Sequence, residues 1–272
     1  MRRALMASLG CLLISPLVFT ASAKAQMAPS DQLQVGPPPQ RRVEPPALET
    51  NKEDLEKKGD ELRASKDYLD ALDYYQTALS KAPNDSLLLN KIGIAELSMH
   101  HFAEAKKYFE HSVKNDKHNS NAYNNLGVIE YIDKKYGKAI KDYKHAIALR
   151  PDMASYYSNL GSAYFSKKDF EKAVPAYDQA MALDPDVFER SSRNGISAQL
   201  AGPEDRAHYN YVMAKLYAKV GATDKALLYL RKAMEEGYPG IESVYKDGEF
   251  SQVRKDPRFV ALMSAKPPGI AE

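Results

Sequence analysis

The sequence contains no tryptophan and only one cysteine, Cys11, among its 272 residues. Cys11 lies in an apolar N-terminal run that we expect to be removed, which would leave a mature chain without a thiol. Such a chain has neither disulfide bonds nor cysteine chemistry, so its stability must come from packing. The aromatic residues are instead 18 Tyr and 8 Phe, which can fill large core positions.

The sequence also lacks an excess of charge of either sign and the common catalytic motifs. The chain has 38 Lys and Arg against 36 Asp and Glu, and so balanced a charge gives no sign of nucleic-acid binding. After the N-terminal run there is no Gly-rich phosphate loop, no HExxH and no Gly-x-Ser-x-Gly. We therefore expect no enzyme activity and no cofactor.

The histidines are the remaining candidates for a metal site. His111 and His145 are 34 residues apart, which would place them about 10 Å apart on neighbouring packed helix pairs. A single metal ion needs both nitrogens at about 2 Å. We therefore expect no metal site.

Residues 1–25 are typical of a secretory signal peptide. Arg2 and Arg3 precede an apolar run and then small residues ending at Ala25, so we expect cleavage after Ala25 or Ala23 and a periplasmic or secreted protein without a membrane span. An uncleaved anchor is an alternative. Lipid attachment at Cys11, suggested by a faint resemblance to a bacterial lipoprotein box, is another, less favoured because apolar residues continue past Cys11.

Residues 26–51 are rich in proline, which cannot donate a backbone hydrogen bond. The segment also has few large apolar residues, so we expect a disordered linker that acts as a spacer. An alternative is that the stretch 38–46 docks as a polyproline helix in an aromatic groove of another protein.

One 34-residue pattern is written twice between Ser120 and Val187. The first copy has an aromatic residue, Leu-Gly, Ala, a second aromatic, a second Ala and Pro, and the second copy repeats each of them 34 residues later. The first set is Tyr123, Leu126, Gly127, Ala139, Tyr143, Ala146 and Pro151, and the second is Tyr157, Leu160, Gly161, Ala173, Tyr177, Ala180 and Pro185.

This pattern resembles the tetratricopeptide repeat, or TPR, a helix-turn-helix unit that stacks into a solenoid. Two further units precede the pair, beginning at Lys52 and Ser86, and a fifth follows at 207–240. The resemblance implies an all-α fold: a right-handed solenoid of antiparallel helix pairs, with four units over 52–187, an insertion over 188–206, and a helical cap and tail over 241–272.

The pattern has a packing reason in each unit. Gly at position 8 and Ala at position 20 let the first helix (A) and the second helix (B) of a unit approach closely, and an aromatic ring at position 24 fills the remaining gap. Pro175 departs from the pattern inside a predicted helix B, where proline kinks or breaks a helix. We expect a bend there.

The free face of the A helices is the predicted binding surface. At 100° per residue, positions 4, 7, 8 and 11 form one stripe and positions 2, 6, 9 and 13 form the opposite one, and the resemblance implies that the second stripe lines a concave groove. We expect the amides and hydroxyls there to hold a peptide backbone, the aliphatic residues an apolar side chain, and the lysine an acidic group. The candidate peptide-binding residues are Asn125, Asn159, Lys91, Asn121, Ile94, Val128, Ile132 and Ser162.

Glu96 and Glu130 share position 11, where the family prefers Tyr. They could act as paired carboxylates in acid/base chemistry, but we expect both to reach the edge of the stack and stay solvated, because no other catalytic group is in phase with them.

The leading hypothesis is an exported interaction module that binds a short peptide segment or a partner protein in the groove. The alternative is a structural or assembly factor of a cell-envelope or polysaccharide-export complex, acting through its convex face and its linker.

Overall fold

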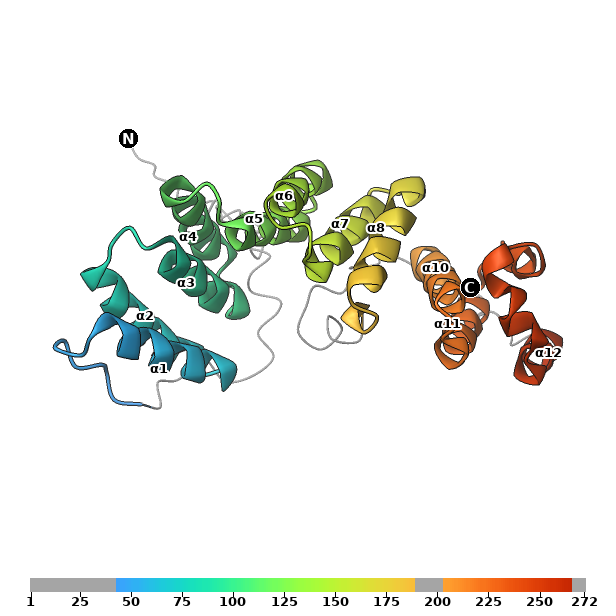
Figure 1. Ribbon diagram of the computed structural model, residues 1–272, viewed down its shortest axis with the longest axis horizontal. Coiled ribbons are helices and arrows are strands. Elements are labelled where there is room, and N and C mark those ends of the chain that lie inside the picture. The colour runs from blue at the N-terminus through green and yellow to red at the C-terminus, as the bar shows by residue number, and fades with distance from the viewer. Residues whose placement is uncertain (1–42, 189–202, 266–272) are drawn as a thin grey trace, which may run out of the picture. The chain divides into compact units, whose positions relative to one another are not determined.

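The computed structural model describes residues 43–188 and 203–265. The predicted signal peptide, residues 26–42 of the predicted linker, residues 189–202 of the predicted insertion and the last seven residues lie outside these ranges. Figure 1 shows helices throughout the described chain. They are α1 (Lys52–Ala64), α2 (Tyr68–Lys81), α3 (Ser86–Ser98), α4 (Phe102–Asn115), α5 (Ser120–Ile132), α6 (Tyr136–Leu149), α7 (Ala154–Ser166), α8 (Phe170–Leu183), α10 (Pro203–Lys219), α11 (Thr223–Glu235) and α12 (Pro257–Ala265).

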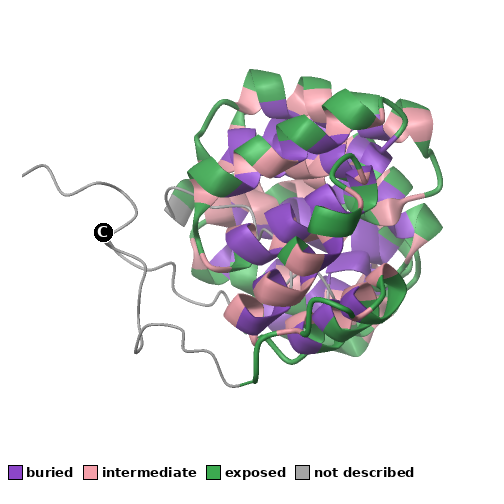
Figure 2. Cartoon of the chain, turned by 90° about the vertical axis from the view of Figure 1, so that its left-hand side faces the viewer, coloured by how far each residue is buried: buried purple, intermediate pink, exposed green. Residues whose placement is uncertain are grey.

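The helices form five antiparallel pairs, α1 with α2 through to α10 with α11, and further helices follow at the C-terminal end. This confirms the predicted all-helical array of TPR-like units. Figure 2 shows buried residues on the sides of the helices that face one another and exposed residues on the outside. Within the described residues no helix is both long and apolar enough to span a bilayer.

The close approach within each of the first four pairs depends on glycine. A Cβ atom built on Gly59, Gly93, Gly127 or Gly161 would lie 2.5 or 2.6 Å from a ring carbon of the aromatic residue at position 24. Real Cβ atoms do not approach a ring so closely, so only glycine fits these positions unless the ring moves. The predicted packing of position 8 against position 24 is therefore confirmed.

The turn inside each of the first four pairs places a non-glycine residue in the left-handed region. Lys66, His100, Lys134 and Lys168 have φ between 59° and 67°, and Gly221 takes the corresponding place in the fifth pair. Backbone hydrogen bonds close these turns. In the first unit, for example, the N–H of Asp67, the residue after Lys66, donates to the carbonyl of Leu62. This is the bonding pattern of a helix C-cap, and it offsets the conformational strain.

The second unit has Ser112 and Lys117 where the first, third and fourth units have Ala and Pro. A buried network of polar side chains surrounds Ser112. The hydroxyl of Ser112 donates to the carbonyl of Ser86 at 2.8 Å, and the side-chain amide of Asn119 donates to both hydroxyls at 2.8 and 3.0 Å. Asn119 also caps α5 by accepting from the N–H of Ala122. The network joins the second unit to the third.

Pro175 does not end its helix. α8 runs from Phe170 to Leu183 with Pro175 inside it, and Pro175 is exposed. The bend that we expect there stays a prediction.

The end of the array is covered by three 3-10 turns, Ile241–Tyr245, Gly248–Ser251 and Val253–Lys255, and by α12. Phe250, Val253 and Phe259 are buried there in the same core as α10 and α11. Asp256 accepts from the N–H of Arg258, as expected for a residue that caps a helix beginning at Pro257.

The end of the predicted linker lies against α2. The N–H of Val43 donates to Asp70, and the ammonium of Lys81 donates to the carbonyl of Leu48 at 2.6 Å. Residues 43–48 are thus held on the first unit.

Candidate functional site

The position-6 amides bridge adjacent units. The Nδ2 atom of Asn125 on α5 donates to Oδ1 of Asn90 on α3, and that of Asn159 on α7 donates to Oδ1 of Asn124 on α5, each at 2.9 Å. Asn125 and Asn159 are half-buried. The expectation that this stripe is free is therefore wrong for them, because position 6 of one unit packs beside position 5 of the unit before it.

The predicted cation is already paired. The Nζ atom of Lys91 lies 2.6 Å from both Glu56 and Asp60 on α1. Partial burial lowers the pKa of Lys91, but the hydrogen bonds to Asp60 and Glu56 outweigh this effect and raise the pKa above its ordinary value. The prediction of a free cation for an acidic ligand is thus wrong, because two carboxylates from the first unit compensate the charge.

Position 9 turns inward in several units. Val128 and Ser162 are each 7% exposed, and the hydroxyl of Tyr177 donates to Ser162. In the first unit the hydroxyl of Tyr75 donates to Asp60 at 2.7 Å in the same way. The expectation that Val128 and Ser162 face the groove is wrong, because position 9 follows the glycine and lies beside the ring at position 24.

Other members of the stripe do remain accessible. Asn121 is exposed, and its Oδ1 atom accepts from the hydroxyl of Tyr156 at 2.5 Å. Ile94 and Ile132 are partly exposed. These residues are accessible, and their role in binding a peptide stays a prediction.

Leu87, which was not among the candidate residues, is 59% exposed on α3, one turn before Lys91. Position 2 is polar or charged in the four other units, so an apolar residue there was the signal that could have singled it out. We call the accessible residues of the three neighbouring A helices the α3–α7 face. It consists of Leu87, Ile94, Asn121, Asn125, Ile132, Ser155 and Asn159.

The two position-11 glutamates are buried, which corrects the expectation that they stay solvated. Glu96 is 8% exposed and lies 2.7 Å from His101, while Glu130 is 5% exposed and accepts from Lys106 at 2.6 Å. No hydrogen bond joins the two glutamates within the described residues. Glu96 is held by a residue of its own unit and Glu130 by a residue of the unit before it, and Oε2 of Glu130 is buried without a hydrogen-bond partner among the described residues. Position 11 is buried in the fourth unit as well, where it is Tyr164.

The buried Glu130 makes stability depend on pH through Asp142 on α6. Burial and the charge of Glu130 raise the pKa of Asp142 to about 6. A carboxyl whose pKa is raised by folding destabilises the fold as pH rises from about 4 through 6. We expect Asp142→Asn to raise the free energy of unfolding by about 1 kcal/mol at pH 7, after allowance for solvent screening, and to leave it nearly unchanged at pH 4.

Urea unfolding of this variant and the parent at both pH values checks the effect. The control is Asp152→Asn in an exposed turn, which should change little at either pH. An equal effect of Asp142→Asn at both pH values would show that the gain does not come from ionisation.

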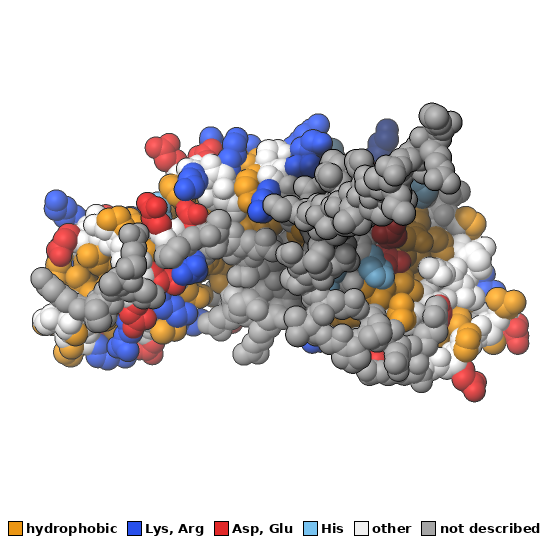
Figure 3. Space-filling model, turned by 180° about the vertical axis from the view of Figure 1, so that it is seen from behind, with side chains coloured by type: hydrophobic (Ala, Val, Ile, Leu, Met, Phe, Trp, Pro, Cys, Tyr) orange, Lys and Arg blue, Asp and Glu red, His pale blue; other side chains and the backbone are white. Residues whose placement is uncertain are grey.

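Charge is mixed over the described surface. Figure 3 shows Lys and Arg side chains next to Asp and Glu side chains on the described part of the side of the molecule that faces the viewer. Among the residues that the structure describes, no three His, Cys, Asp or Glu side chains are grouped as metal ligands. On the α3–α7 face itself the accessible groups are amides, a hydroxyl and aliphatic side chains.

The sequence model of the tetratricopeptide repeat family matches residues 118–186. The match covers the two copies of the 34-residue pattern. The helix pairs before them share the glycine and aromatic contacts of the TPR units. TPR arrays act as scaffolds that present extended surfaces to other proteins.

Several solved structures are similar. A crystal structure of MamA is 24% identical over 70% of this chain and 97% of its own, with a TM-score of 0.46. MamA from Desulfovibrio magneticus is 20% identical over 70% and 97%, with a TM-score of 0.48. TTC0263, a TPR protein of Thermus thermophilus, is 21% identical over 78% and 99%, with a TM-score of 0.48. No curated protein sequence matches the chain.

Proposed function

We propose that this protein binds a short peptide segment of a partner protein on the α3–α7 face. The observation that carries the proposal is Leu87, a large apolar side chain that is 59% exposed beside a row of amides. Leu87, Ile94 and Ile132 offer contact to an apolar side chain of the segment. Burying one such side chain contributes about 1.5 to 3 kcal/mol.

The amides supply the polar contacts. An Asn side chain has two N–H donors and an oxygen with two lone pairs. Asn125 and Asn159 each give one N–H to the neighbouring unit, which leaves the second N–H for a peptide carbonyl. Because the inter-unit bond holds each amide in place, less side-chain entropy is lost on binding.

The charge around Lys91 refines the kind of partner. Lys91 lies between Glu56 and Asp60 at the edge of the face. These two carboxylates also have Lys52 and Arg63 at 4.0 Å, so the charges of the cluster are already compensated. An acidic group in the peptide would have to displace one of these carboxylates. We therefore propose a segment with an apolar anchor and without a carboxylate beside it.

Binding should depend on the amides and on Leu87. Asn125→Ala with Asn159→Ala should weaken partner binding by about 1 to 3 kcal/mol. Because both amides also join units, this double variant should lower the free energy of unfolding by about 1 to 2 kcal/mol. Titration calorimetry and urea unfolding measure the two effects.

Leu87→Asp separates binding from stability, since its side chain is already exposed. It should leave unfolding unchanged and reduce partner affinity tenfold or more. The matched control is Leu183→Asp on α8, where the leucine is 38% exposed. The partner for these titrations is first recovered by crosslinking from the cell-envelope fraction. Parent affinity in both the Leu87 and the double Asn variants would exclude this face as the site.

We also propose that the chain is exported, on the strength of Arg2, Arg3 and the apolar run that ends at Ala25. Terminal sequencing of the protein made in a Gram-negative bacterium should find a chain that starts at Gln26 or Lys24. A retained Met1, or lipid on Cys11, would contradict this proposal.

A further inference from the structure

An accessible cleft lies toward the C-terminal end of the array, between α11 and α12. It has a volume of about 720 Å³ and is lined by residues of both helices. Ligand sites in proteins commonly have volumes of about 300 to 1,000 Å³. We call it the α11–α12 cleft. Its lining residues are Asp224, Leu227, Leu228, Arg231, Glu235, Arg258, Ala261, Leu262 and Ala265.

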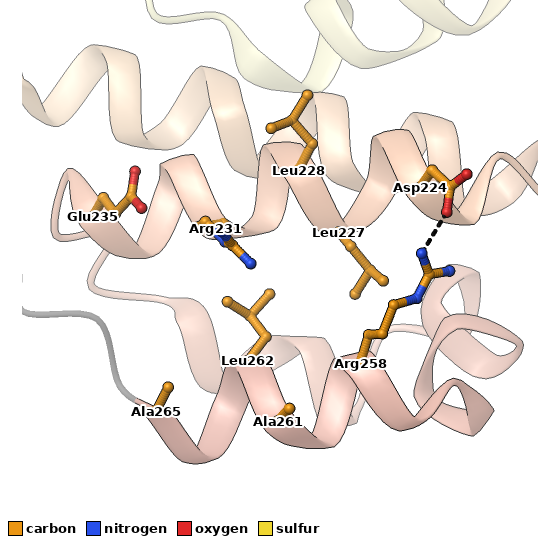
Figure 4. Close-up of a pocket in the computed structure, with 9 residues that line it drawn as sticks. All are labelled: Asp224, Leu227, Leu228, Arg231, Glu235, Arg258, Ala261, Leu262 and Ala265. Atoms are coloured by element: carbon orange, nitrogen blue, oxygen red, sulfur yellow. Dashed lines mark hydrogen bonds and ion pairs between the residues drawn. The ribbon is translucent and has the colours of Figure 1, made fainter.

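The cleft has apolar walls. Figure 4 shows Leu227 directed from α11 toward α12 and Leu262 directed back from α12. Ala261 and Ala265 lie one turn apart on α12, and both are exposed. Since neither alanine fills the space above it, the gap can accept a side chain from outside.

The two arginines that line the cleft differ in whether they form ion pairs. Arg258 closes one end through ion pairs to Asp224 and Asp256, both at 2.7 Å. Arg231 also lines the gap (Figure 4), but it makes no hydrogen bond or ion pair within the described residues. Glu235, one turn further along α11, lines the same cleft (Figure 4) and likewise makes no hydrogen bond or ion pair within the part of the chain that the structure describes. The cleft therefore offers an unpaired guanidinium beside an apolar wall, with an unpaired carboxylate next to it.

We propose that the α11–α12 cleft is a second docking site, for a partner segment with an apolar side chain followed by an acidic one. The apolar side chain lies against Leu227 and Leu262, and the carboxylate pairs with Arg231, whose planar guanidinium suits bidentate binding. The nine residues of α12 span about 13 Å, which is the length of about four residues in extended conformation. This site is separate from the α3–α7 face. The acidic residue in its partner segment distinguishes that segment from the one proposed for the α3–α7 face, which has no carboxylate beside its apolar anchor.

The test uses a displayed library of random 12-residue peptides selected on the full chain. Selected peptides should pair an apolar with an acidic residue. Ala261→Phe, which fills the cleft, and Arg231→Glu, which reverses its charge, should each reduce their affinity tenfold or more. Selection on the Arg231→Glu chain should instead enrich a basic residue. The matched controls are Ala148→Phe on α6, at another exposed helix alanine, and Lys107→Glu on α4, and both should keep parent affinity.

Several outcomes would overturn the proposal. One is that no selected peptide loses affinity on Ala261→Phe. Another is that binding appears only after residues 266–272 are removed, which would assign the cleft to the chain's own end. A third is that the parent is a dimer and Ala261→Phe a monomer, which would assign it to a second copy. Peptides lost on Leu87→Asp but kept on Ala261→Phe would support the α3–α7 face and count against the cleft.

Discussion

Gly127→Ala should lower the free energy of unfolding by about 1 to 3 kcal/mol, the usual cost of overpacking a core. The added methyl would lie 2.6 Å from Cε1 of Tyr143. Tyr143 is 1% exposed, so its ring can move only if α5 and α6 separate. Urea unfolding followed by circular dichroism measures the loss.

Gly137→Ala is the matched control, because it makes the same change in α6 where a Cβ atom meets nothing within 4 Å. It should raise stability by about 0.5 to 1 kcal/mol, the helix preference of alanine over glycine. Tyr143→Leu should make Gly127→Ala less harmful, since a smaller side chain leaves room for the methyl. A loss at Gly127 no greater than at Gly137 would show that position 8 does not set the distance between the helices.

Asn119→Ala should lower the free energy of unfolding by about 2 to 4 kcal/mol. It removes the cap of α5, which contributes about 1 kcal/mol, and it deprives the buried hydroxyls of Ser86 and Ser112 of a donor. Unmade buried hydrogen bonds add about 1 to 3 kcal/mol. Thermal and urea unfolding check the value, and Asn84→Ala in an exposed turn is the control and should change little.

A double-mutant cycle separates the network from the cap. Ser112→Ala restores the alanine that the other units have, and it should be less harmful in the Asn119→Ala background, because the network is already broken there. We expect a coupling of at least about 0.5 kcal/mol. Strictly additive losses would mean that Asn119 acts through the cap alone.

The packing within each unit could be predicted because it repeats. Gly127 and Tyr143 recur at the same offsets as Gly161 and Tyr177, and a pattern that recurs reports contacts made the same way in every unit. The last helix could be placed from Asp256 and Pro257, since a capping residue before a proline marks a helix start.

The contacts between units could not be predicted in this way. A helical projection of a single helix places Asn125 and Val128 on the free side. In the structure, however, Asn125 donates a hydrogen bond to Asn90 of the preceding unit. Val128 is buried in the same core cluster as Tyr143. Lys91 pairs with two acids that are 31 and 35 residues away, and Glu130 pairs with Lys106 on a different unit. These pairings depend on which residues of neighbouring units lie side by side in the stack. Residues that do not repeat from unit to unit give no pattern from which that neighbourhood could be predicted.

This difference between contacts within a unit and contacts between units applies to the α3–α7 face that we propose for binding. The amides on α5 and α7 belong both to the stack and to the surface, so their orientation is fixed before any ligand arrives. The accessible leucine on α3 belongs to the surface alone. Substitutions at Leu87 therefore test binding more cleanly than substitutions at the asparagines.

Site-specific photocrosslinking tests the central claim most directly. A photoreactive phenylalanine analogue is placed at Leu87 or Asn121 on the α3–α7 face, and at Ala103 or Ala148 on the exposed sides of the B helices α4 and α6. Binding on the α3–α7 face predicts a crosslink to the same partner protein from Leu87 and Asn121 and none from the two alanines. A partner that crosslinks from Ala103 or Ala148 and not from Leu87 would contradict the account.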